Sequence, residues 1–454
     1  MPINEGVTIV TRAGVAPSKA DFRMGVLRTH LYNYALARRA RTEGRKAIFI
    51  MRGDDSDLAR HTDTNLKQLY EILAYKVGLT IDIHPYNAEK KLGVSLHQSR
   101  RNDIYEGYLN KLLDLGLARA VDNTDAVALD MVAFADRFGT RMRLQDLVLK
   151  RGGVDVDLEL MIKNQRDRNK PTYVPIRRAD RSYLFHLCSP VDDYEFGVTH
   201  VLRGSDKLSI EACQEMVRIA LDFPPVQYGH IPMLKPPVNQ DGSTRLLELE
   251  KQGFSIRALV SYCLSSGFGD PDKVYAEIDT FSAGFSPDKI HKNDATFDPQ
   301  KLANINKKLV RSSPTKEYQD ELIEYFKMKT PALIKGLAAW PATQELWNFL
   351  FKLRLTYPEA ANLVAKIVEN PAYGDKPQRF VDQCKTLLVV CNGNITCKDD
   401  VLKTTQPLKV DDVYHLLRWC LTGDTKGQDP FEIARILEAN GKLKERVDHF
   451  LNSN

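Results

Sequence analysis

Two short apolar runs flank a long amphipathic segment near the N-terminus, and this arrangement limits the possible folds more than any other feature of the chain. Residues 7–15 and 46–52 are rich in β-branched and apolar side chains, and apolar residues recur at helical spacing within Val26–Thr42. A strand, a helix and a second strand in this order form a βαβ unit with parallel strands. The sequence therefore predicts a parallel sheet covered by helices, with the first helix beginning at Met24 or Gly25 after a loop of small residues.

The later segments change in character along the chain. The stretch beginning HTDTNL has apolar residues at helical spacing and a capping-type start at Asp63 or Thr64, and residues 99–116 form another periodic helix that ends in glycine. Residues 118–185 alternate short strands with charged loops, as an inserted subdomain would. Helical periodicity dominates from about Thr315 onward. A chain of 454 residues is therefore expected to hold several domains, with an α/β part followed by an all-α part.

The composition is typical of a soluble globular protein. Apolar residues make up 43% and charged residues 27% of the chain, and no run is long and apolar enough to suggest a membrane span. The N-terminal residues lack the pattern of a secretory signal or a transit peptide, so we expect a cytoplasmic location. The net charge of +5 permits a polyanionic partner without requiring one.

The seven cysteines favour reduced thiols over a disulfide framework. Cys384, Cys391 and Cys397 are spaced more widely than the ligand pairs of most zinc sites. His186 and Cys188, which we expect on one short strand, are a poor pair of metal ligands. The sequence therefore predicts buried thiols and no metal site.

Several segments, taken in order along the chain, resemble the class I glutamyl-tRNA synthetases. GVLRTHLYNYALAR (Gly25–Arg38) is similar to the family's Gly-x-x-Arg-Thr-Ala-Leu-x-Asn helix, and RGDDSDLARHT (Arg52–Thr62) is similar to its Arg-x-Glu-Asp-Thr-Asp segment. VDDYEFGVTHVLRGSDKL (Val191–Leu208) resembles the stretch that closes the active site. LLRWCLTGDTKGQDPFEIARIL (Leu416–Leu437) resembles the end of the anticodon-binding domain. Because the resemblance extends over nearly the whole chain, it is more specific than any single motif.

The resemblance implies an architecture. We expect an α/β, Rossmann-like class I synthetase catalytic domain with an inserted α+β subdomain, followed by an all-α C-terminal half. The expected parts are 1–98, the first half of the catalytic domain; 99–182, an inserted acceptor-binding subdomain; 183–240, the second half of the catalytic domain; 241–313, a helical stem-contact region; and 314–454, an all-α anticodon-binding-like domain.

The two ATP signatures of the family are altered in this chain. Where the family has His-x-Gly-His, the sequence has Arg23, Met24, Gly25 and Val26, and the loop after Ser18 lacks the family's Pro-Thr-Gly. The second signature, a Lys-Leu-Ser-Lys-Arg loop, is missing from PPVNQDGSTRLLELEKQGF, where Arg245 is the nearby cation. Losing one transition-state cation or donor typically slows a reaction by about a hundred- to a thousandfold. The resemblance therefore implies a degenerate nucleotide site made of Ser18, Arg23, Gly25 and Arg245.

The amino-acid side of the site is better preserved. By resemblance, Arg203 helps to hold the substrate carboxylate, Asp54 receives the α-ammonium group, and Arg12 supplies a second cation. Phe185 stands where the family has tyrosine, and Ser189 where it has asparagine. These two changes alter hydrogen bonding to the bound amino acid, with glutamate as the expected ligand.

The residues expected to move protons are Asp57, Asp193 and His200. Two of them have a structural alternative: Asp57, together with Asp54 and Asp55, is also typical of a turn or a helix cap, and His200 is typical of a core histidine bonded to the backbone. In the C-terminal half, Arg354, Arg379 and Lys426 are expected to contact tRNA phosphates, with a solvated charged face as the alternative.

Three functions fit these observations. The first is an enzyme, expected to be a monomer, that keeps tRNA(Glu) and glutamyl binding, has lost ATP-dependent activation, and uses glutamyl-tRNA in transfer, cyclisation or hydrolysis of the glutamyl group. The second is a divergent but active synthetase in which Arg23 and Arg245 jointly replace the lost groups, with ATP and Mg²⁺ as cofactors only in this case. The third is a tRNA-binding regulatory protein without catalysis.

Overall fold

The structure is a computed structural model that describes residues 8–57, 60–121, 124–149, 153–237, 244–374, 376–392, 394–406 and 408–453. The chain folds into two compact units. The first comprises Met1–Leu249 and Ile256–Ile305, and the second comprises Glu250–Ser255 and Asn306–Asn454. The finer boundaries expected at residues 98, 182 and 240 stay predictions.

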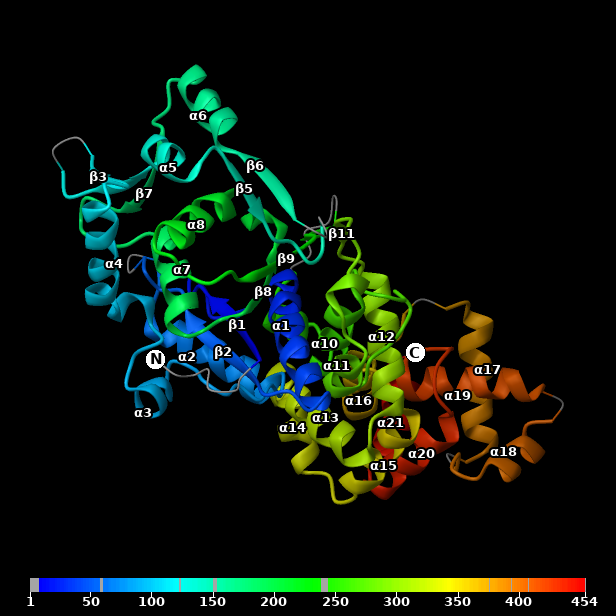
Figure 1. The fold of residues 1–454 in the computed structure, drawn as a ribbon. Coiled ribbons are helices and arrows are strands. Elements are labelled where there is room, and N and C mark those ends of the chain that lie inside the picture. The colour runs from blue at the N-terminus through cyan, green and yellow to red at the C-terminus, as the bar shows by residue number, and fades with distance from the viewer. Residues whose placement is uncertain are drawn as a thin grey trace. The chain divides into compact units, whose positions relative to one another are not determined.

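A four-stranded sheet forms the centre of the first unit (Figure 1), with strand order β2-β1-β8-β9. Its strands are β1 (Ile9–Val15), β2 (Ala47–Gly53), β8 (His200–Gly204) and β9 (Gln227–Ile231), and every neighbouring pair is parallel. Helix α1 (Met24–Thr42) connects β1 to β2. The predicted βαβ unit and parallel sheet are therefore confirmed.

Asn33 ties α1 to the middle of the sheet. Its amide nitrogen donates to the carbonyl oxygen of Leu202 over 2.6 Å, and its amide oxygen accepts from the Leu202 N–H over 2.9 Å. The hydroxyl of Thr11 on β1 donates to the carbonyl oxygen of Asn33 over 2.9 Å. These bonds hold the first helix against β1 and β8, the two central strands of the sheet.

The segment between β2 and β8 combines helices with two small antiparallel sheets, ordered β3-β4-β7 and β5-β6. Its elements are α2 (Asp63–Glu71), the π-helical turn η1 (Ile72–Lys76), α3 (Ala88–Leu92), η2 (Gln98–Arg100), α4 (Asn102–Asp114), β3 (Ala118–Ala120), β4 (Val127–Asp130), α5 (Met131–Phe138), β5 (Arg141–Leu144), β6 (Val154–Asp157), α6 (Leu158–Asp167), β7 (Tyr173–Arg177) and α7 (Phe185–Glu195). In Figure 1 the small sheets and α5 and α6 lie together, away from β1 and β2, as an inserted subdomain does.

Two local predictions in this segment are wrong. Helix α2 is capped by Thr62, whose hydroxyl accepts from the Asn65 N–H over 3.2 Å, and not by Asp63 or Thr64. His186 and Cys188 lie in helix α7 and not on a strand. The run SYLFHLCSPV is apolar enough for a buried strand, and periodicity alone does not separate such a strand from a buried helix.

The first unit continues through elements that follow the sheet. They are η3 (Ser205–Lys207), α8 (Leu208–Ala220), β10 (Leu234–Lys235), α9 (Leu246–Lys251), α10 (Ile256–Ser265), α11 (Ile278–Ala283), η4 (Pro287–Lys289), β11 (Ala295–Thr296) and α12 (Pro299–Ser312), of which α9 and α12 each run on into the second unit. β10 pairs in parallel with β11. The segment in which the Lys-Leu-Ser-Lys-Arg loop is expected to be missing includes residues 238–243, which lie outside the described residues.

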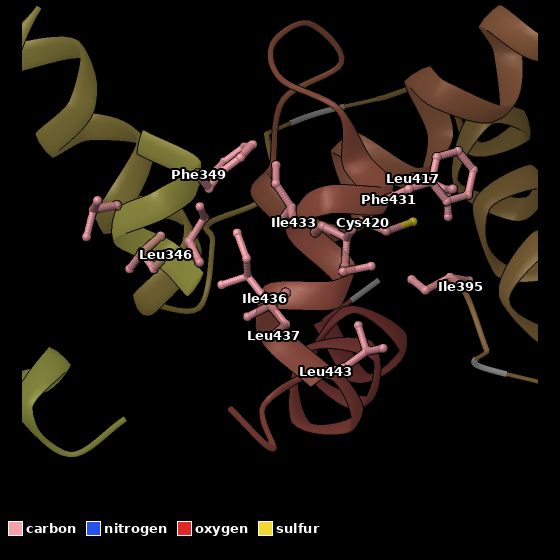
Figure 2. Packing of buried hydrophobic residues seen from close by; sticks show 14 of the residues in the cluster. Leu346, Phe349, Ile395, Leu417, Cys420, Phe431, Ile433, Ile436, Leu437 and Leu443 are labelled. Carbon is pink, nitrogen blue, oxygen red and sulfur yellow. The ribbon is translucent and has the colours of Figure 1, made fainter. Parts of the chain in front are cut away.

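Helices are the only regular secondary structure among the described residues of the second unit. Its helices are α13 (Thr315–Lys329), α14 (Pro331–Ala338), α15 (Thr343–Leu353), α16 (Tyr357–Val368), α17 (Gln378–Val390), α18 (Lys398–Thr404), α19 (Val410–Thr422), α20 (Pro430–Ala439) and α21 (Leu443–Ser453). Figure 2 shows Ile433 and Ile436 of α20 between Leu346 of α15 and Leu417 of α19, and all four side chains are buried. The predicted all-α C-terminal half is therefore confirmed. Across the described part of both units, no helix has the length and apolar character that crossing a bilayer requires.

Candidate functional site

Two arginines from neighbouring strands converge on one carboxylate. Arg12 of β1 places Nε 2.5 Å from Oδ1 and Nη2 2.9 Å from Oδ2 of Asp193 on α7. Arg52 of β2 places Nη1 3.0 Å from Oδ1 of the same aspartate. All three side chains are buried. Such a network holds each charge in a fixed geometry, because each buried guanidinium has a carboxylate partner.

Helix α7 supplies one face of this site because Phe185, Ser189 and Asp193 follow one another at intervals of four residues. The hydroxyl of Ser189 accepts from Nη2 of Arg12 over 3.1 Å and from Nη2 of Arg52 over 3.3 Å. The Phe185 ring centroid lies 6.0 Å from the guanidinium carbon of Arg52. The structure thus brings together Arg12, Phe185 and Ser189, which the sequence indicated for the glutamyl site, and Asp193, which it indicated for proton transfer.

Asp54 joins the network immediately after β2. Its Oδ1 accepts from Nε of Arg52 over 2.6 Å. A Cβ atom on Gly14 would lie only 2.4 Å from Oδ2 of Asp54, so a side chain at position 14 would displace the carboxylate. Gly14 therefore provides the space in which Asp54 turns toward the end of β1, where an ammonium group would need an anion.

Asp193 is a stable anion in this environment. Burial alone would raise the pKa of Asp193, but the charges of Arg12 and Arg52 outweigh it, and the pKa lies below its ordinary value. The Tyr228 hydroxyl lies 3.4 Å from Oδ2 of the same carboxylate. Asp193 is thus suited to holding the two arginines, and would transfer a proton only after losing its partners.

Arg203, at the carboxyl end of β8, faces a second set of groups. Its Nη1 donates to Oε1 of Gln214 over 2.7 Å, and its Nη2 lies 3.4 Å from Oε2 of Glu211. Its guanidinium carbon lies 4.2 Å from the ring centroid of Tyr228. Because the Tyr228 hydroxyl reaches Asp193, this ring connects Arg203 to the network of Arg12 and Arg52.

Asp57 and His200 lie apart from this network. The Asp57 carboxylate accepts from Nε of Arg60 over 2.6 Å, and this bond lowers the pKa of Asp57. His200 begins β8, with Nδ1 2.8 Å from the hydroxyl of Thr199, and burial lowers its pKa. Because Asp57 follows the carboxyl end of β2 and His200 stands at the amino end of β8, the two residues lie toward opposite ends of the parallel strands. Their proposed role in proton transfer stays a prediction.

His30 on the buried side of α1 was not indicated by the sequence. Its side chain is 3% exposed, and neither ring nitrogen has a hydrogen-bond partner among the described residues. Its ring meets the edge of Phe22, with the centroids 5.4 Å apart. Burial, opposed by Asp54 and assisted by Arg12, lowers the pKa of His30 to about 4. The sequence feature that could have indicated His30 is Thr-His-Leu, which stands where the family has Thr-Ala-Leu.

The start of α1 is crossed by the segment that follows residue 243. The Met24 N–H, the first of the helix, donates to the carbonyl oxygen of Thr244 over 2.8 Å. Arg23 and Arg245 face one another in an antiparallel bridge, and Nη1 of Arg245 donates to the carbonyl oxygen of Asp21 over 3.0 Å. A helix start binds phosphate through its free N–H groups. One of those groups is already occupied here by the chain itself.

The other two residues of the expected nucleotide site frame the same helix start. Ser18 is exposed in the loop after β1, where its N–H donates to the carbonyl oxygen of Ala16 over 3.0 Å. Gly25 packs closely on β10, since a Cβ at this position would lie 3.4 Å from Cβ of Leu234. No group of three or more His, Cys, Asp or Glu residues in the described ranges is arranged to hold a metal ion.

The basic residues expected to contact tRNA differ in their environments. In the second unit, Arg379 and Lys426 are exposed. Arg354 instead donates from Nη1 to the carbonyl oxygen of Ser313 over 2.8 Å and from Nη2 to the hydroxyl of Thr315 over 2.9 Å. Arg354 therefore has a structural role, because its two hydrogen bonds stabilise the start of α13.

Comparisons with known proteins found related sequences and a related fold. The family model described as "tRNA synthetases class I (E and Q), catalytic domain" matches residues 9–127. A glutamate–tRNA ligase of Methylacidiphilum infernorum is 31% identical over 335 residues, which cover 72% of this chain and 69% of that protein. Glutamate–tRNA ligase 2 of Campylobacter concisus is 25% identical over 98% of this chain and 99% of its own length. The structure of a glutamate tRNA ligase from Elizabethkingia meningosepticum in complex with its amino acid shares the fold, with a TM-score of 0.72 at 16% identity, over 98% of this chain and 99% of that one.

Proposed function

The chain belongs to the family of class I glutamyl-tRNA synthetases, and we propose that it binds tRNA(Glu) and uses glutamyl-tRNA as its substrate without activating glutamate itself. The glutamyl group would then be transferred, cyclised or hydrolysed. The names of its relatives support glutamate and tRNA as ligands. The contrast between a connected amino-acid network and an obstructed helix start supports the loss of activation.

The observation that carries the proposal is the bond between the Met24 N–H and the carbonyl oxygen of Thr244. A nucleoside triphosphate at this helix start would need that N–H group and the positive end of the helix for its phosphates. A carbonyl oxygen there presents negative partial charge instead, and Arg23 replaces the histidine of the family signature. The described residues therefore fit a triphosphate poorly, and the chemistry that we propose needs no nucleotide.

An ester at the tRNA 3′ end is already activated. An amine or water attacks the ester carbonyl carbon, the bond to the ribose oxygen breaks, and the proton of the nucleophile passes to that oxygen. In this scheme Asp54 receives the α-ammonium group of the glutamyl residue, and the guanidinium groups of Arg12 and Arg203 orient its side-chain carboxylate. Ser189 and Asp193 hold Arg12 in place.

A specific observation also favours the second function, a divergent synthetase that still uses ATP. The bridge between Arg23 and Arg245 brings two arginines together at the helix start. Two guanidinium groups there would offer bidentate contacts to phosphate oxygens. Under this alternative they replace the histidine and lysine of the two family signatures.

One experiment separates these functions. We would measure glutamate-dependent ATP–pyrophosphate exchange with tRNA present, beside a reaction supplied with pre-formed glutamyl-tRNA. We expect no exchange above background and consumption of glutamyl-tRNA. Exchange above background would contradict the proposal in favour of an active synthetase, and the absence of both activities would favour a tRNA-binding protein without catalysis.

A further inference from the structure

Behind the glutamyl site lies a buried cluster of charges contributed by three distant parts of the chain. Glu211 of α8, His230 of β9 and Asp146 of the inserted segment are each at most 2% exposed. Nε2 of His230 lies 2.9 Å from Oε2 of Glu211, and its Nδ1 lies 3.4 Å from Oδ2 of Asp146. This cluster meets the site at Arg203, which pairs with Glu211.

The inserted segment fixes the position of His230. Oδ1 of Asp146 accepts from the N–H groups of Val148 over 2.9 Å and of His230 over 3.2 Å. The two carboxylates together outweigh the effect of burial and raise the pKa of His230. Nε2 of His230 lies 2.9 Å from Oε2 of Glu211 and 3.2 Å from Nε of Arg203, so the imidazole contacts both members of the Arg203–Glu211 pair.

The pairing with Glu211 changes what Arg203 offers to a ligand. Every nitrogen of its guanidinium faces a protein group: Nη1 faces Gln214, Nη2 faces Glu211, and Nε lies 3.2 Å from Nε2 of His230. Arg203 can still donate hydrogen bonds, but its positive charge is balanced by a carboxylate that is also buried. In a site of low polarity, a balanced cation attracts an anionic ligand much less than an unpaired one does.

The charges of the whole network also balance. Four guanidinium groups, those of Arg12, Arg52, Arg101 and Arg203, form ion pairs with four carboxylates, those of Asp54, Asp192, Asp193 and Glu211. Nδ1 of His230 lies 3.4 Å from Oδ2 of Asp146, and this pair adds no excess positive charge to the network. Within the described residues, the network therefore has no excess positive charge to offset an anionic ligand.

Free glutamate and esterified glutamate differ in their net charge. Free glutamate carries two carboxylates and one ammonium group, so its net charge is −1. A glutamyl ester has lost the α-carboxylate charge, so its net charge is zero. A buried network without excess charge accommodates the neutral zwitterion at a lower desolvation cost than the anion.

We propose that Glu211 is a specificity-determining residue that, by neutralising Arg203, makes this site select the esterified glutamyl group over free glutamate. This inference rests on the proposed use of glutamyl-tRNA and names the residue that would enforce it. A purely structural role for Glu211 is the competing explanation, because the cluster also ties the inserted segment to the sheet. A structural role would affect stability, but it would not change the preference between two ligands of different charge.

The test measures equilibrium binding to the full-length chain by calorimetry. The probes are free L-glutamate and its α-amide, which keeps the side-chain carboxylate and the ammonium group but lacks the α-carboxylate charge. We expect the wild-type chain to bind the α-amide at least about tenfold more tightly than glutamate, and Glu211→Gln to reduce that preference by about tenfold through tighter binding of glutamate. Equal binding of the two probes by the wild-type chain, or binding of neither, would overturn the proposal.

Glu215→Gln is the matched control. Glu215 lies one turn further along α8 and pairs with Arg218 over 2.7 Å, so its substitution removes the same charge without touching Arg203. We expect this variant to keep the wild-type preference, and an equal shift in both variants would contradict the proposal. If Glu211→Gln does not fold, the wild-type chain still tests the proposal, because equal binding of the two probes would overturn it. This test measures binding and no reaction, so its result is independent of the assay for consumption of glutamyl-tRNA. The inference about Glu211 and the proposed function can therefore fail separately.

Discussion

At the scale of single residues, His30 predicts a pH dependence of stability. In the unfolded chain its pKa returns to about 6.5, whereas in the folded chain it is about 4. Between these values the unfolded chain binds a proton that the folded chain excludes, so the folded state loses stability as the pH falls. Over this range, the free energy of unfolding of His30→Ala should fall by about 3 kcal/mol less than that of the wild type. The substitution removes a group whose pKa differs by about 2.5 between the two states, and each pKa unit corresponds to about 1.4 kcal/mol.

Urea unfolding at pH 7, 5.5 and 4 measures this difference. His291→Ala is the control, because the side chain of His291 is exposed. The control should follow the wild type at each pH. Parallel losses in His30→Ala and the wild type would show that the imidazole of His30 gains a proton or a partner within the folded chain.

Asp193 predicts a large loss of stability when its charge is removed. Asp193→Asn leaves the buried guanidinium groups of Arg12 and Arg52 without their shared anion, and losing one partner of a buried pair costs roughly 3–5 kcal/mol. We expect a loss of that size in the free energy of unfolding, measured with urea at pH 7. Asp57→Asn removes the partner of Arg60, whose side chain is exposed, and should leave the free energy of unfolding close to that of the wild type. Similar free energies of unfolding for Asp193→Asn and Asp57→Asn would show that the buried ion pairs contribute little to stability.

At the scale of elements, the start of α1 predicts that one substitution does not recreate a nucleotide site. Arg23→His restores the first residue of the family signature, but the Met24 N–H stays bonded to Thr244. We therefore expect ATP–pyrophosphate exchange by this variant to stay at background, with glutamate and tRNA present. Exchange that appeared on this change alone would show that the residue at position 23, and not the segment crossing the helix, limits activation.

Elements whose signals are local could be predicted from the sequence. The apolar runs and the helical period between them identify β1, α1 and β2, and the four-residue spacing of Phe185, Ser189 and Asp193 was available once α7 was known to be a helix. Expecting a strand there hid this shared face. The capping residue of α2 was missed by one position, which is within the usual uncertainty of helix ends.

The remaining features of the site depend on contacts between distant segments. Asp146, Glu211 and His230 are separated by 65 and 19 positions in the sequence, and no periodicity links them. The crossing of the α1 start by Thr244 likewise depends on a tertiary backbone bond. His30 could have been noticed as a departure from the family's alanine, but only the structure shows that its ring nitrogens are buried without a partner among the described residues.

At the scale of the whole molecule, the second unit predicts which basic residues contribute to tRNA binding. Each contact between a cation and a phosphate releases counterions, so binding weakens with salt and its log–log slope counts the contacts. Arg379 and Lys426 are exposed on this unit. Arg379→Ala and Lys426→Ala should each make the slope shallower by about 1 if they contact phosphates.

Arg354 gives the contrasting case within the same unit. Its guanidinium bonds to Ser313 and Thr315 and lies 5.3 Å from the Tyr318 ring centroid. Arg354→Ala should therefore lower the stability of the second unit while leaving the salt slope for tRNA(Glu) unchanged. Filter binding between 50 and 300 mM salt, beside thermal unfolding, separates the two effects. If the three variants changed the slope equally, Arg354 would also contact phosphate, and if none did, the basic residues would only keep this face solvated.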